Sequence, residues 1–523
     1  MGYKRFLQIV CIIVCISMCC ACAKSKTGNE KEITDSGVVD GSKEDAGDKN
    51  GSNFINIDND ELPYTQEEIF EQLFDINNYI EVNIDVSDDE LKQIQKDYEE
   101  YSGMGSKSPI YRQANLEITI KTEVDEHTYL IEDVGIRMKG NTSRTDFYDD
   151  EYGQYNLIHF KIDFQETFDD ENYYRTPVDW SDDEVGREAR KDRTFATLEN
   201  LELRWNKCDD STYVREYAAY EMYREQGLLA QHTNLASVDV GEEHQGVFMM
   251  YEPIDKVFIE KYVAEEDQGG DLYKASWTWR GADLTKEASI GIEDEDKAEF
   301  YIYDLKTNKK SSNGEPMTNL INKLAVSNIT KEEIAELVDM EYFVKYEAVS
   351  YFIGDPDDAR NNYNNHYVYF LKSSGKAIFI PCDLDRCFGV TKSWNPSGDA
   401  MVSISPYSKR AIGANGEQQQ NPLYLKTVCR GGYYIEEYTE ALNEVFGSKY
   451  LTVRKFEEIY DVANGNYSSK TTPSKLYYNG EFHNFSFSFE RSEGLNSAEG
   501  NASVTEYLQN KKQYFMQYME EIQ

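Results

Sequence analysis

Positive charge is scarce in this chain of 523 residues. It carries 54 Lys and Arg against 96 Asp and Glu, which leaves a formal net charge of −42 at pH 7. A protein that binds nucleic acid or an anionic lipid surface needs clustered Lys and Arg to neutralise phosphates. The composition therefore argues against nucleic acid as a partner of the protein body. The excess of acid indicates a well-solvated surface and says little about the fold.

Cysteine is also scarce beyond the N-terminal segment, where only Cys208, Cys382, Cys387 and Cys429 remain. None of them belongs to a CxxC pair, which argues against a zinc site. The regular D-x-D-x-D-G loop of a calcium site is lacking as well. One or two disulfides stay open as an alternative for a protein outside the cell. We expect mostly buried free thiols, which pack as small apolar side chains.

A long apolar run stands at the N-terminus. Two basic residues precede Phe6–Ala21, which is too short to span a membrane comfortably and is typical of a secretion signal. The run ends in the letters CCAC, and a small residue directly before Cys22 resembles a bacterial lipobox. We expect Cys22 to carry a lipid, with Cys19 or Cys20 as alternative sites and an ordinary cleaved signal peptide as the other interpretation. The protein would then lie outside the cytoplasm, anchored to the membrane by this lipid alone.

The composition divides the chain into four stretches. Residues 1–22 form the expected lipoprotein signal peptide, and residues 23–62 are too polar to bury a core, which predicts a disordered acidic tether. Residues 63–262 contain many alternating segments and predict a β-rich N-terminal lobe. Residues 263–523 are mainly helical in periodicity and predict a helical C-terminal lobe. The expected fold class is α+β.

Three further stretches predict local structure. Residues 168–193 are acidic and predict a loop, residues 209–226 predict one helix ended by Gly227, and residues 422–446 predict another helix.

The most informative stretch is Gly354–Gly389. It begins GDPDDARNNYNNHYVYF and ends GKAIFIPCDLDRCFG, so an acidic and amide-rich loop is followed by two strands and a second pair of acids. Magnesium prefers hard oxygen ligands, and phosphoryl transfer depends mainly on positioning and charge neutralisation. Asp357 or Asp358 suits a residue that accepts a hydroxyl proton, while Asn365, Asp383 and Asp385 suit metal ligands. A polar turn capped by Asp and Asn is the structural alternative.

Two basic strands precede this stretch. Arg137 and Lys139 fall on one face of a strand that runs into a Gly-Asn-Thr-Ser turn, which could cradle an anion. Lys161 lies in the middle of another strand and could reach nucleotide phosphates, with Glu216 in the following helix as its orienting carboxylate. Exposed lysines and arginines on ordinary strands are the alternative explanation. The order basic strand, helix with Glu, then acid, amide and acid is the order found in kinases.

Six segments together resemble the CotH family, which is named for a bacterial spore-coat protein and described as atypical protein kinases. The matching segments are Arg137–Ser143 (RMKGNTS), Asp210–Gly227 (DSTYVREYAAYEMYREQG), Gly246–Lys261 (GVFMMYEPIDKVFIEK), Asp271–Lys274 (DLYK), Asn364–Tyr369 (NNHYVY) and Gly375–Gly389 (GKAIFIPCDLDRCFG).

The resemblance implies an atypical protein-kinase-like fold that binds ATP and Mg²⁺. It makes Lys161 the nucleotide-binding lysine and Glu216 its partner. Asp357 or Asp358 becomes the catalytic acid, and Asn365 and Asp383 become metal ligands. The implied activity is phosphate transfer from ATP to Ser or Thr of a surface or spore-coat protein.

A second function stays open from the sequence. The same fold could serve as a non-catalytic assembly or binding protein on the cell surface or coat, because ATP is scarce outside a cell. The abundant tyrosines could then line a face for a glycan or a protein.

Overall fold

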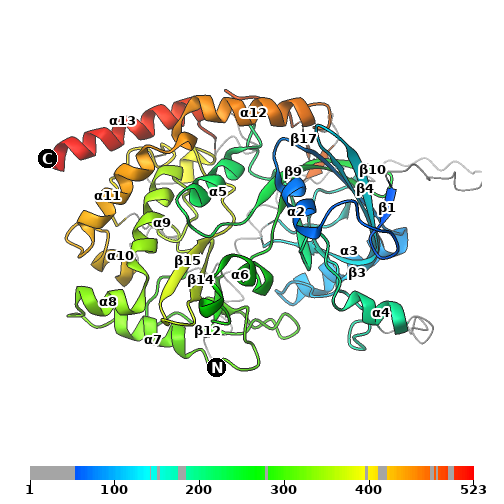
Figure 1. The fold of residues 1–523 in the computed structure, drawn as a ribbon, viewed down its shortest axis with the longest axis horizontal. Helices are drawn as coiled ribbons and strands as arrows, with labels where there is room; N and C mark the ends of the chain where they lie inside the picture. Colours follow the sequence, from blue (N-terminus) through cyan, green and yellow to red (C-terminus); the bar gives the residue numbers. More distant parts are fainter. Residues whose placement is uncertain are drawn as a thin grey trace, which may run out of the picture. The chain divides into compact units, whose positions relative to one another are not determined.

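The structure is a computed structural model (Figure 1). It describes residues 54–141, 143–149, 154–174, 184–276, 281–394, 398–409, 421–471, 476–478, 481–483, 485–492 and 500–522. The predicted signal peptide, its lipid site Cys22 and all but the last nine residues of the predicted tether lie outside the described residues. The described residues belong to one compact unit, Asn50–Gln523.

The first sheet has eight strands in the order β1-β4-β3-β2-β9-β10-β8-β7, and a further pairing of β4 with β7 closes it into a ring. Two of its pairings, β1 with β4 and β2 with β9, are parallel, and the others are antiparallel. Its strands are β1 (Phe54–Asn56), β2 (Tyr79–Asp85), β3 (Arg112–Lys121), β4 (Glu126–Lys139), β7 (His159–Asp163), β8 (Asn200–Trp205), β9 (Thr233–Val240) and β10 (Glu243–Tyr251).

Alternation of apolar and polar residues explains this sheet. In β2 every second residue is buried, with Ile80, Val82 and Ile84 inside and their neighbours partly exposed. In a strand, successive side chains point to opposite faces, so this pattern places one face against the core. Helices α2 (Gln66–Phe74) and α3 (Asp88–Gly103) contribute buried apolar residues to the same core.

A second sheet of five strands lies further along the chain, in the order β12-β13-β11-β14-β15. Its strands are β11 (Leu272–Ala275), β12 (Ile290–Gly291), β13 (Tyr303–Leu305), β14 (His366–Phe370) and β15 (Ala377–Pro381). The antiparallel pair β14–β15 is the strand pair that the sequence predicts after the acidic loop. Two short hairpins, β5–β6 (Tyr148–Asp149 with Gln154–Tyr155) and β16–β17 (Leu476–Tyr478 with Glu481–His483), form separate two-stranded sheets.

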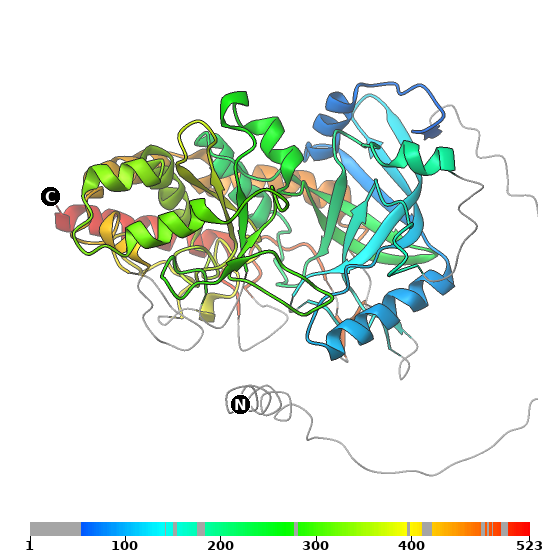
Figure 2. The ribbon, with the colours of Figure 1, turned by 90° about the horizontal axis from the view of Figure 1, so that it is seen from below.

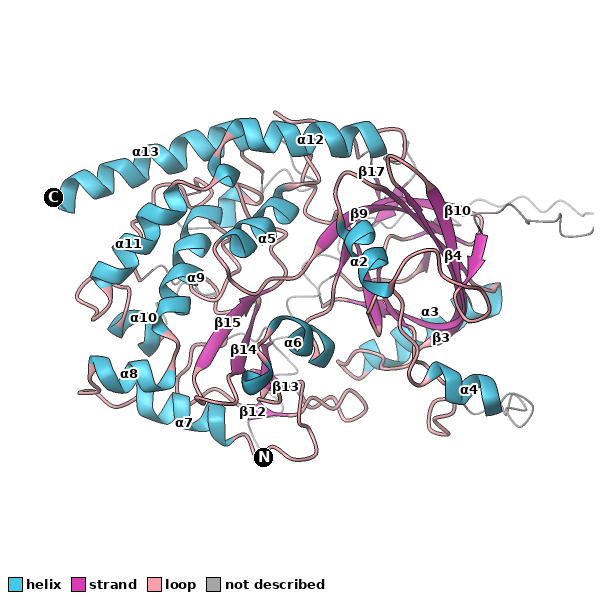
Figure 3. Cartoon of the chain, in the orientation of Figure 1, coloured by secondary structure: helices cyan, strands magenta, loops and turns pink. Residues whose placement is uncertain are grey.

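Most of the remaining helices follow residue 314, and Figures 2 and 3 show them gathered beside the first sheet. They are α7 (Glu315–Leu324), α8 (Lys331–Leu337), α9 (Met340–Ile353), α10 (Pro422–Lys426), α11 (Ile435–Phe446), α12 (Val453–Tyr467) and α13 (Val504–Ile522), with α4 (Glu184–Arg190), α5 (Arg215–Glu225) and α6 (Lys256–Tyr262) earlier in the chain. The fold is therefore a mixture of α and β structure, as the sequence predicts.

Several local predictions need correction. Helix α4 lies inside residues 168–193, which were expected to be a loop, and the expected helix 422–446 is interrupted between α10 and α11. Strand β1 lies within the predicted tether, because its backbone pairs with β4 at Phe54, Ile55 and Asn56. In the second sheet the sequence predicts β14, β15 and a strand at 272–277, but it misses β12 and β13, which are only two and three residues long.

Contacts also cross the boundary predicted at residue 262. The ring of Tyr223 on α5 lies 5.4 Å from that of Tyr346 on α9, so α5 packs with the later helices (Figure 1). At the end of α12, the Tyr467 hydroxyl donates a hydrogen bond to Leu235 O and accepts one from Ile80 N–H, both at 2.8 Å. The C-terminal part of the chain is thus bound directly to strands β2 and β9.

Candidate functional site

A row of four charged side chains joins the first sheet to the loop that follows β15. Lys139 on β4 forms an ion pair with Glu202 on β8, and Arg204, two residues further along β8, binds Glu202 at 3.3 Å. The other side of the Arg204 guanidinium contacts Asp383, with 2.5 Å between Nη1 and Oδ1. Charges from the ring-shaped sheet and from the acidic segment therefore meet in one place.

Strand geometry brings these side chains together. Arg137 on β4 faces Lys161 on β7, and Lys161 faces Glu202 on β8, in the registers of the two antiparallel pairs. Residues opposite each other in antiparallel strands share a face, as do residues two apart in one strand. Lys139 and Arg204 therefore join the same charged face. The opposite face carries the buried side chains of Phe160, Ile162 and Leu203.

Asp383 sits where the chain turns after β15. Its backbone has φ 56°, an uncommon conformation for a residue with a side chain, and its carboxylate stays 46% exposed. Although burial opposes ionisation, Arg204, Lys139 and Lys274 hold the pKa of Asp383 below its ordinary value. The same burial, with Arg204 and Lys274 nearby, lowers the pKa of Lys139 well below its ordinary value. The site keeps an ionised, accessible carboxylate among cations.

The acidic loop reaches the same place through Asn365. Its side-chain nitrogen donates to Asp357 Oδ2 and to the backbone oxygen of Asp383, both at 3.1 Å. Asn362 and Asn364 also donate to the Asp357 carboxylate. Burial raises the pKa of Asp357 to about 6, against the opposing effects of Asn362 and Arg386. An acid, an amide and a second acid thus lie together, as the spacing predicts.

The neighbouring Asp358 is oriented differently. One of its oxygens accepts a hydrogen bond from the hydroxyl of Ser350 on α9, and the other accepts backbone N–H groups of Arg360 and Asn361 at 2.9 and 2.6 Å. Its side chain is buried and fixes the turn. Asp355, which the sequence analysis did not single out, is also fully buried and accepts the Asp357 N–H at 2.7 Å.

Glu216 connects helix α5 to the acidic segment. Its carboxylate accepts a hydrogen bond from the Leu384 backbone N–H at 3.1 Å and from the Tyr251 hydroxyl at 2.6 Å. Burial, strengthened by the negative charges of Asp385 and Asp383, raises the pKa of Glu216 to about 8, although Arg204 opposes the shift. Glu216 therefore holds the backbone between the two acids and does not bind Lys161.

A pocket opens beside this row of charges. It is lined by His159, Arg204, Trp205, Asn206, Lys207, Cys208, Asp210, Tyr213, Arg215, Glu216, Met249, Tyr251 and Asp385. At its wall the Cys208 thiol donates to Asp385 Oδ2 at 3.1 Å. Burial and the charge of Asp383 raise the pKa of Asp385 above its ordinary value.

Within the described chain the four cysteines beyond the N-terminal segment are free thiols, as expected.

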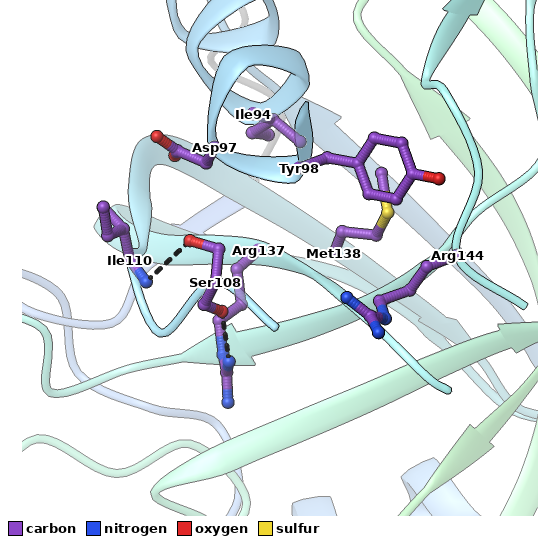
Figure 4. Close-up of a pocket in the computed structure, with 8 residues that line it drawn as sticks. All are labelled: Ile94, Asp97, Tyr98, Ser108, Ile110, Arg137, Met138 and Arg144. Atoms are coloured by element: carbon purple, nitrogen blue, oxygen red, sulfur yellow. Dashed lines mark hydrogen bonds between the residues drawn. The ribbon is translucent and has the colours of Figure 1, made fainter. Parts of the chain in front are cut away.

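Arg137 is bound elsewhere, whereas Lys161 lies beside the row of charges, opposite Glu202 in the sheet. The Arg137 guanidinium donates to Ser108 O at 2.7 Å and lies 5.0 Å from the Tyr111 ring, so it fixes the loop before β3. It belongs to a small pocket between α3 and β4, with Arg144 (Figure 4). Lys161 stands between Arg137 and Glu202 in the sheet and forms no ion pair among the described residues.

The sequence analysis missed Glu202 and Arg204. Both lie in β8, which directly precedes α5, and they alternate with the buried residues Leu201, Leu203 and Trp205. Two opposite charges on the same face of a strand, directly before a helix carrying a buried Glu, are a signal that could have identified them. Without the sheet register, however, Lys161 was equally placed to serve as the cation.

The described residues contain no group of three or more His, Cys, Asp and Glu side chains suited to hold a metal ion on their own. Within the same part of the chain, no helix has both the length and the apolar character needed to cross a bilayer.

A family model matches most of this chain. The model of a family described as CotH kinase protein matches residues 160–513, which is more than half of the chain and includes Arg204, Glu216, Asp357, Asn365 and Asp383. No curated protein matches the chain.

Proposed function

The chain belongs to the CotH family, and on this basis we propose that it is an atypical kinase that binds ATP with Mg²⁺ and transfers phosphate to Ser or Thr of a surface or spore-coat protein. The observation that carries the proposal is the contact of Arg204 with Asp383, beside the hydrogen bonds of Asn365 to Asp357 and Asp383. A cation and hard oxygen donors from distant parts of the chain converge there.

The donor set fits Mg²⁺ bound together with a nucleotide. Magnesium is usually held by one or two carboxylates together with phosphate oxygens and water, so a protein cluster of three acids is not needed. Asp383 offers a half-exposed carboxylate, and Asn365 offers a side-chain oxygen that accepts no hydrogen bond within the described chain. Asp385 would be a further ligand once its charge is compensated. When bound, Mg²⁺ neutralises the phosphate oxygens and orients them for transfer.

Each charged residue of the site would have a separate role in binding or phosphate transfer. Arg204 and Lys139 would bind phosphate oxygens, with Glu202 orienting both cations. Glu216 would keep the Asp383–Asp385 segment in place through the Leu384 N–H. Asp357 would accept the proton of the acceptor hydroxyl, because it is partly exposed and its pKa of about 6 suits a base near neutral pH, whereas the side chain of Asp358 is buried.

The order of elements supports a kinase-like arrangement of two lobes. Strand β8 with its cation is followed by α5 with Glu216, then by β9 and β10, and residues 252–255 lead from the first sheet into α6. The acids then follow β14 and β15. We propose that the ring-shaped sheet and the later helices correspond to the N-terminal and C-terminal lobes.

Titration calorimetry with Mg²⁺–ADP tests the proposal, followed by a phosphate-transfer assay with Mg²⁺–ATP. Asp383→Asn should weaken Mg²⁺–ADP binding by at least about tenfold, which corresponds to about 1.4 kcal/mol. Asp58→Asn is the matched control, because Asp58 is also a half-exposed partner of an arginine, Arg193. Equal affinity of the parent and Asp383→Asn, or no binding to the parent, would refute the proposal.

A non-catalytic docking protein on the same fold is the second candidate. Arg204 already occupies one oxygen of Asp383, which favours a self-contained ion pair over a metal site. Retained binding to a coat or wall protein without nucleotide binding would support this function.

The proposed location is the outer face of the membrane, with the lipid on Cys22. Mass spectrometry of the mature protein distinguishes a lipid on Cys22 from a lipid on Cys19 or Cys20 and from an ordinary cleaved signal peptide. Cys22→Ala should release the protein from the membrane fraction.

A further inference from the structure

A C-terminal segment covers the connection between β8 and α5. The ring of Phe487 stacks on that of Tyr213 with 4.5 Å between centroids. Arg491 binds the Asp209 carboxylate with two hydrogen bonds, of 2.6 and 3.0 Å. The connection between the strand of Arg204 and the helix of Glu216 is therefore held by residues almost 300 positions later in the sequence.

Residues 500–502, further along this C-terminal segment, lie against residues 389–392, which continue the chain after Asp383 and Asp385. Ala502 N–H donates to Gly389 O at 2.8 Å, and Lys392 N–H donates to Gly500 O at 3.0 Å. The approach is close, because a Cβ at Gly389 would lie 2.9 Å from the Ala502 Cβ and the backbone there has φ 92°. Only glycine fits this position without displacement.

The side chain of Asn501 links the connection between β8 and α5 to residues 389–392. Its buried side chain accepts the Thr391 backbone N–H at 2.8 Å and donates from Nδ2 to Asp209 O at 3.1 Å. Both partners have left-handed backbones, with φ 56° at Thr391 and 51° at Asp209. Such a conformation is a marked outlier for a β-branched residue, and strained residues persist only where surrounding contacts hold them.

Both left-handed residues lead directly to the candidate site. The Thr391 hydroxyl accepts a hydrogen bond from Arg386 at 2.7 Å, and Arg386 lies one residue after Asp385. On the other side, Asp210 follows Asp209 and pairs with Arg215, the residue before Glu216, at 2.9 Å. Asn501 thus sits at the centre of a chain of contacts that ends at the acids on one side and at Glu216 on the other.

We propose that Asn501 is a positioning residue that holds two left-handed backbone turns, at Asp209 and Thr391, and so keeps helix α5 and the acidic segment in the geometry that binds nucleotide. The inference rests on the proposed function only for its nucleotide readout. Asn501 contacts none of the candidate ligands itself and acts through the two segments that carry them.

Calorimetry with Mg²⁺–ADP on the full-length protein gives the first test. Asn501→Ala should lower the affinity by about tenfold or more at a temperature well below the melting points of both proteins. Asn234→Ala is the matched control, because Asn234 on β9 is also a buried amide and donates to two backbone oxygens at the end of α2, those of Leu73 and Asp75. It should lower the melting temperature while the affinity changes by less than about twofold. Equal affinity losses in the two variants would overturn the proposal.

Hydrogen exchange gives a second test that needs no nucleotide. Asn501→Ala should speed amide exchange in residues 207–216 and 383–392 and leave the first sheet unchanged. Asn501→Asp keeps the acceptor for Thr391 and loses the donor to Asp209, so only residues 207–216 should exchange faster. Unchanged exchange in both segments, in either variant that folds, refutes the inference. Absence of nucleotide binding to the parent refutes the proposed function alone, and the exchange data then decide the role of Asn501.

Discussion

Two arginine–carboxylate pairs in this chain have similar chemistry and different surroundings. Arg360 lies 3.2 Å from Glu347, and both side chains are completely buried, whereas Arg204 contacts an Asp383 carboxylate that is about half exposed. Arg360 also donates to Ser408 O and to the Tyr438 hydroxyl, so its surroundings consist of fixed protein groups. The Arg360–Glu347 pair is thus closed off from solvent, whereas the Arg204–Asp383 pair leaves one carboxylate accessible.

The largest effect is expected at the buried pair. Arg360→Met leaves the Glu347 charge without its partner in the interior, which should cost about 3–5 kcal/mol in the free energy of unfolding. Urea denaturation measures the loss. The double variant Arg360→Met/Glu347→Leu should recover most of it, because no buried charge is then left uncompensated. A single variant within about 1 kcal/mol of the parent would show that the pair is not needed for stability.

Glu216 is a buried glutamate like Glu347, but it forms no ion pair among the described residues. Its pKa of about 8 in the folded protein lies above the ordinary value of 4.5, so the folded state retains a proton that the unfolded chain releases. The stability of the parent should therefore fall as the pH rises from 4.5 to 8, by up to about 1.4 kcal/mol per pH unit from this group.

Glu216→Gln has no proton to lose and should show a flatter dependence over the same range. Urea denaturation at several pH values between 5 and 8 compares the two proteins. Parallel curves would mean that the ionisation of Glu216 does not contribute to the stability of the fold.

Arg204 should affect ligand binding more than folding. Arg204→Met removes the cation next to Asp383 and should weaken Mg²⁺–ADP binding by about tenfold, or about 1.4 kcal/mol. Arg112→Met, which breaks the pair between β3 and Asp97 on α3, provides the control and should leave the affinity unchanged. Tighter binding by Arg204→Met would instead indicate that Arg204 competes with the metal for Asp383.

The smallest effect is expected at Lys161, which the sequence made the nucleotide-binding lysine. It lies next to Glu202 in the sheet but has no bond to Glu216 or Asp383 among the described residues. Lys161→Gln should change the Mg²⁺–ADP affinity by less than about threefold, whereas Lys139→Gln should lower it more. A larger loss for Lys161 than for Lys139 would restore the assignment made from the sequence.

The sequence predicted those parts of the site that are local in the chain. The spacing of Asp357, Asn365 and Asp383 around two short strands was sufficient, because a hairpin brings the ends of its strands together. Family membership was also predicted, from six short segments in the correct order. The alternating strands of the first sheet were visible for the same local reason.

The partners in the first sheet could not be predicted in this way. Which cation meets Asp383 depends on the register between β4, β7 and β8 and on the closure of the ring, and neither is encoded in a single strand. The different roles of Asp357 and Asp358 likewise depend on contacts that the sequence does not show. The Ser350 hydroxyl and two backbone N–H groups donate hydrogen bonds to Asp358. Asn501 was invisible because its partners lie 110 and 292 residues away.

The Tyr467 hydroxyl has a consequence for how this chain is made. It links Ile80 and Leu235 in neighbouring strands from a position 387 residues after the first of them. A ribosome makes the chain from its N-terminus. The contacts between β2 and β9 are therefore complete only after Tyr467, in the last quarter of the polypeptide, has been synthesised. A product shortened before α12 should be recognised by proteases as incompletely folded, although it contains every strand of the two large sheets.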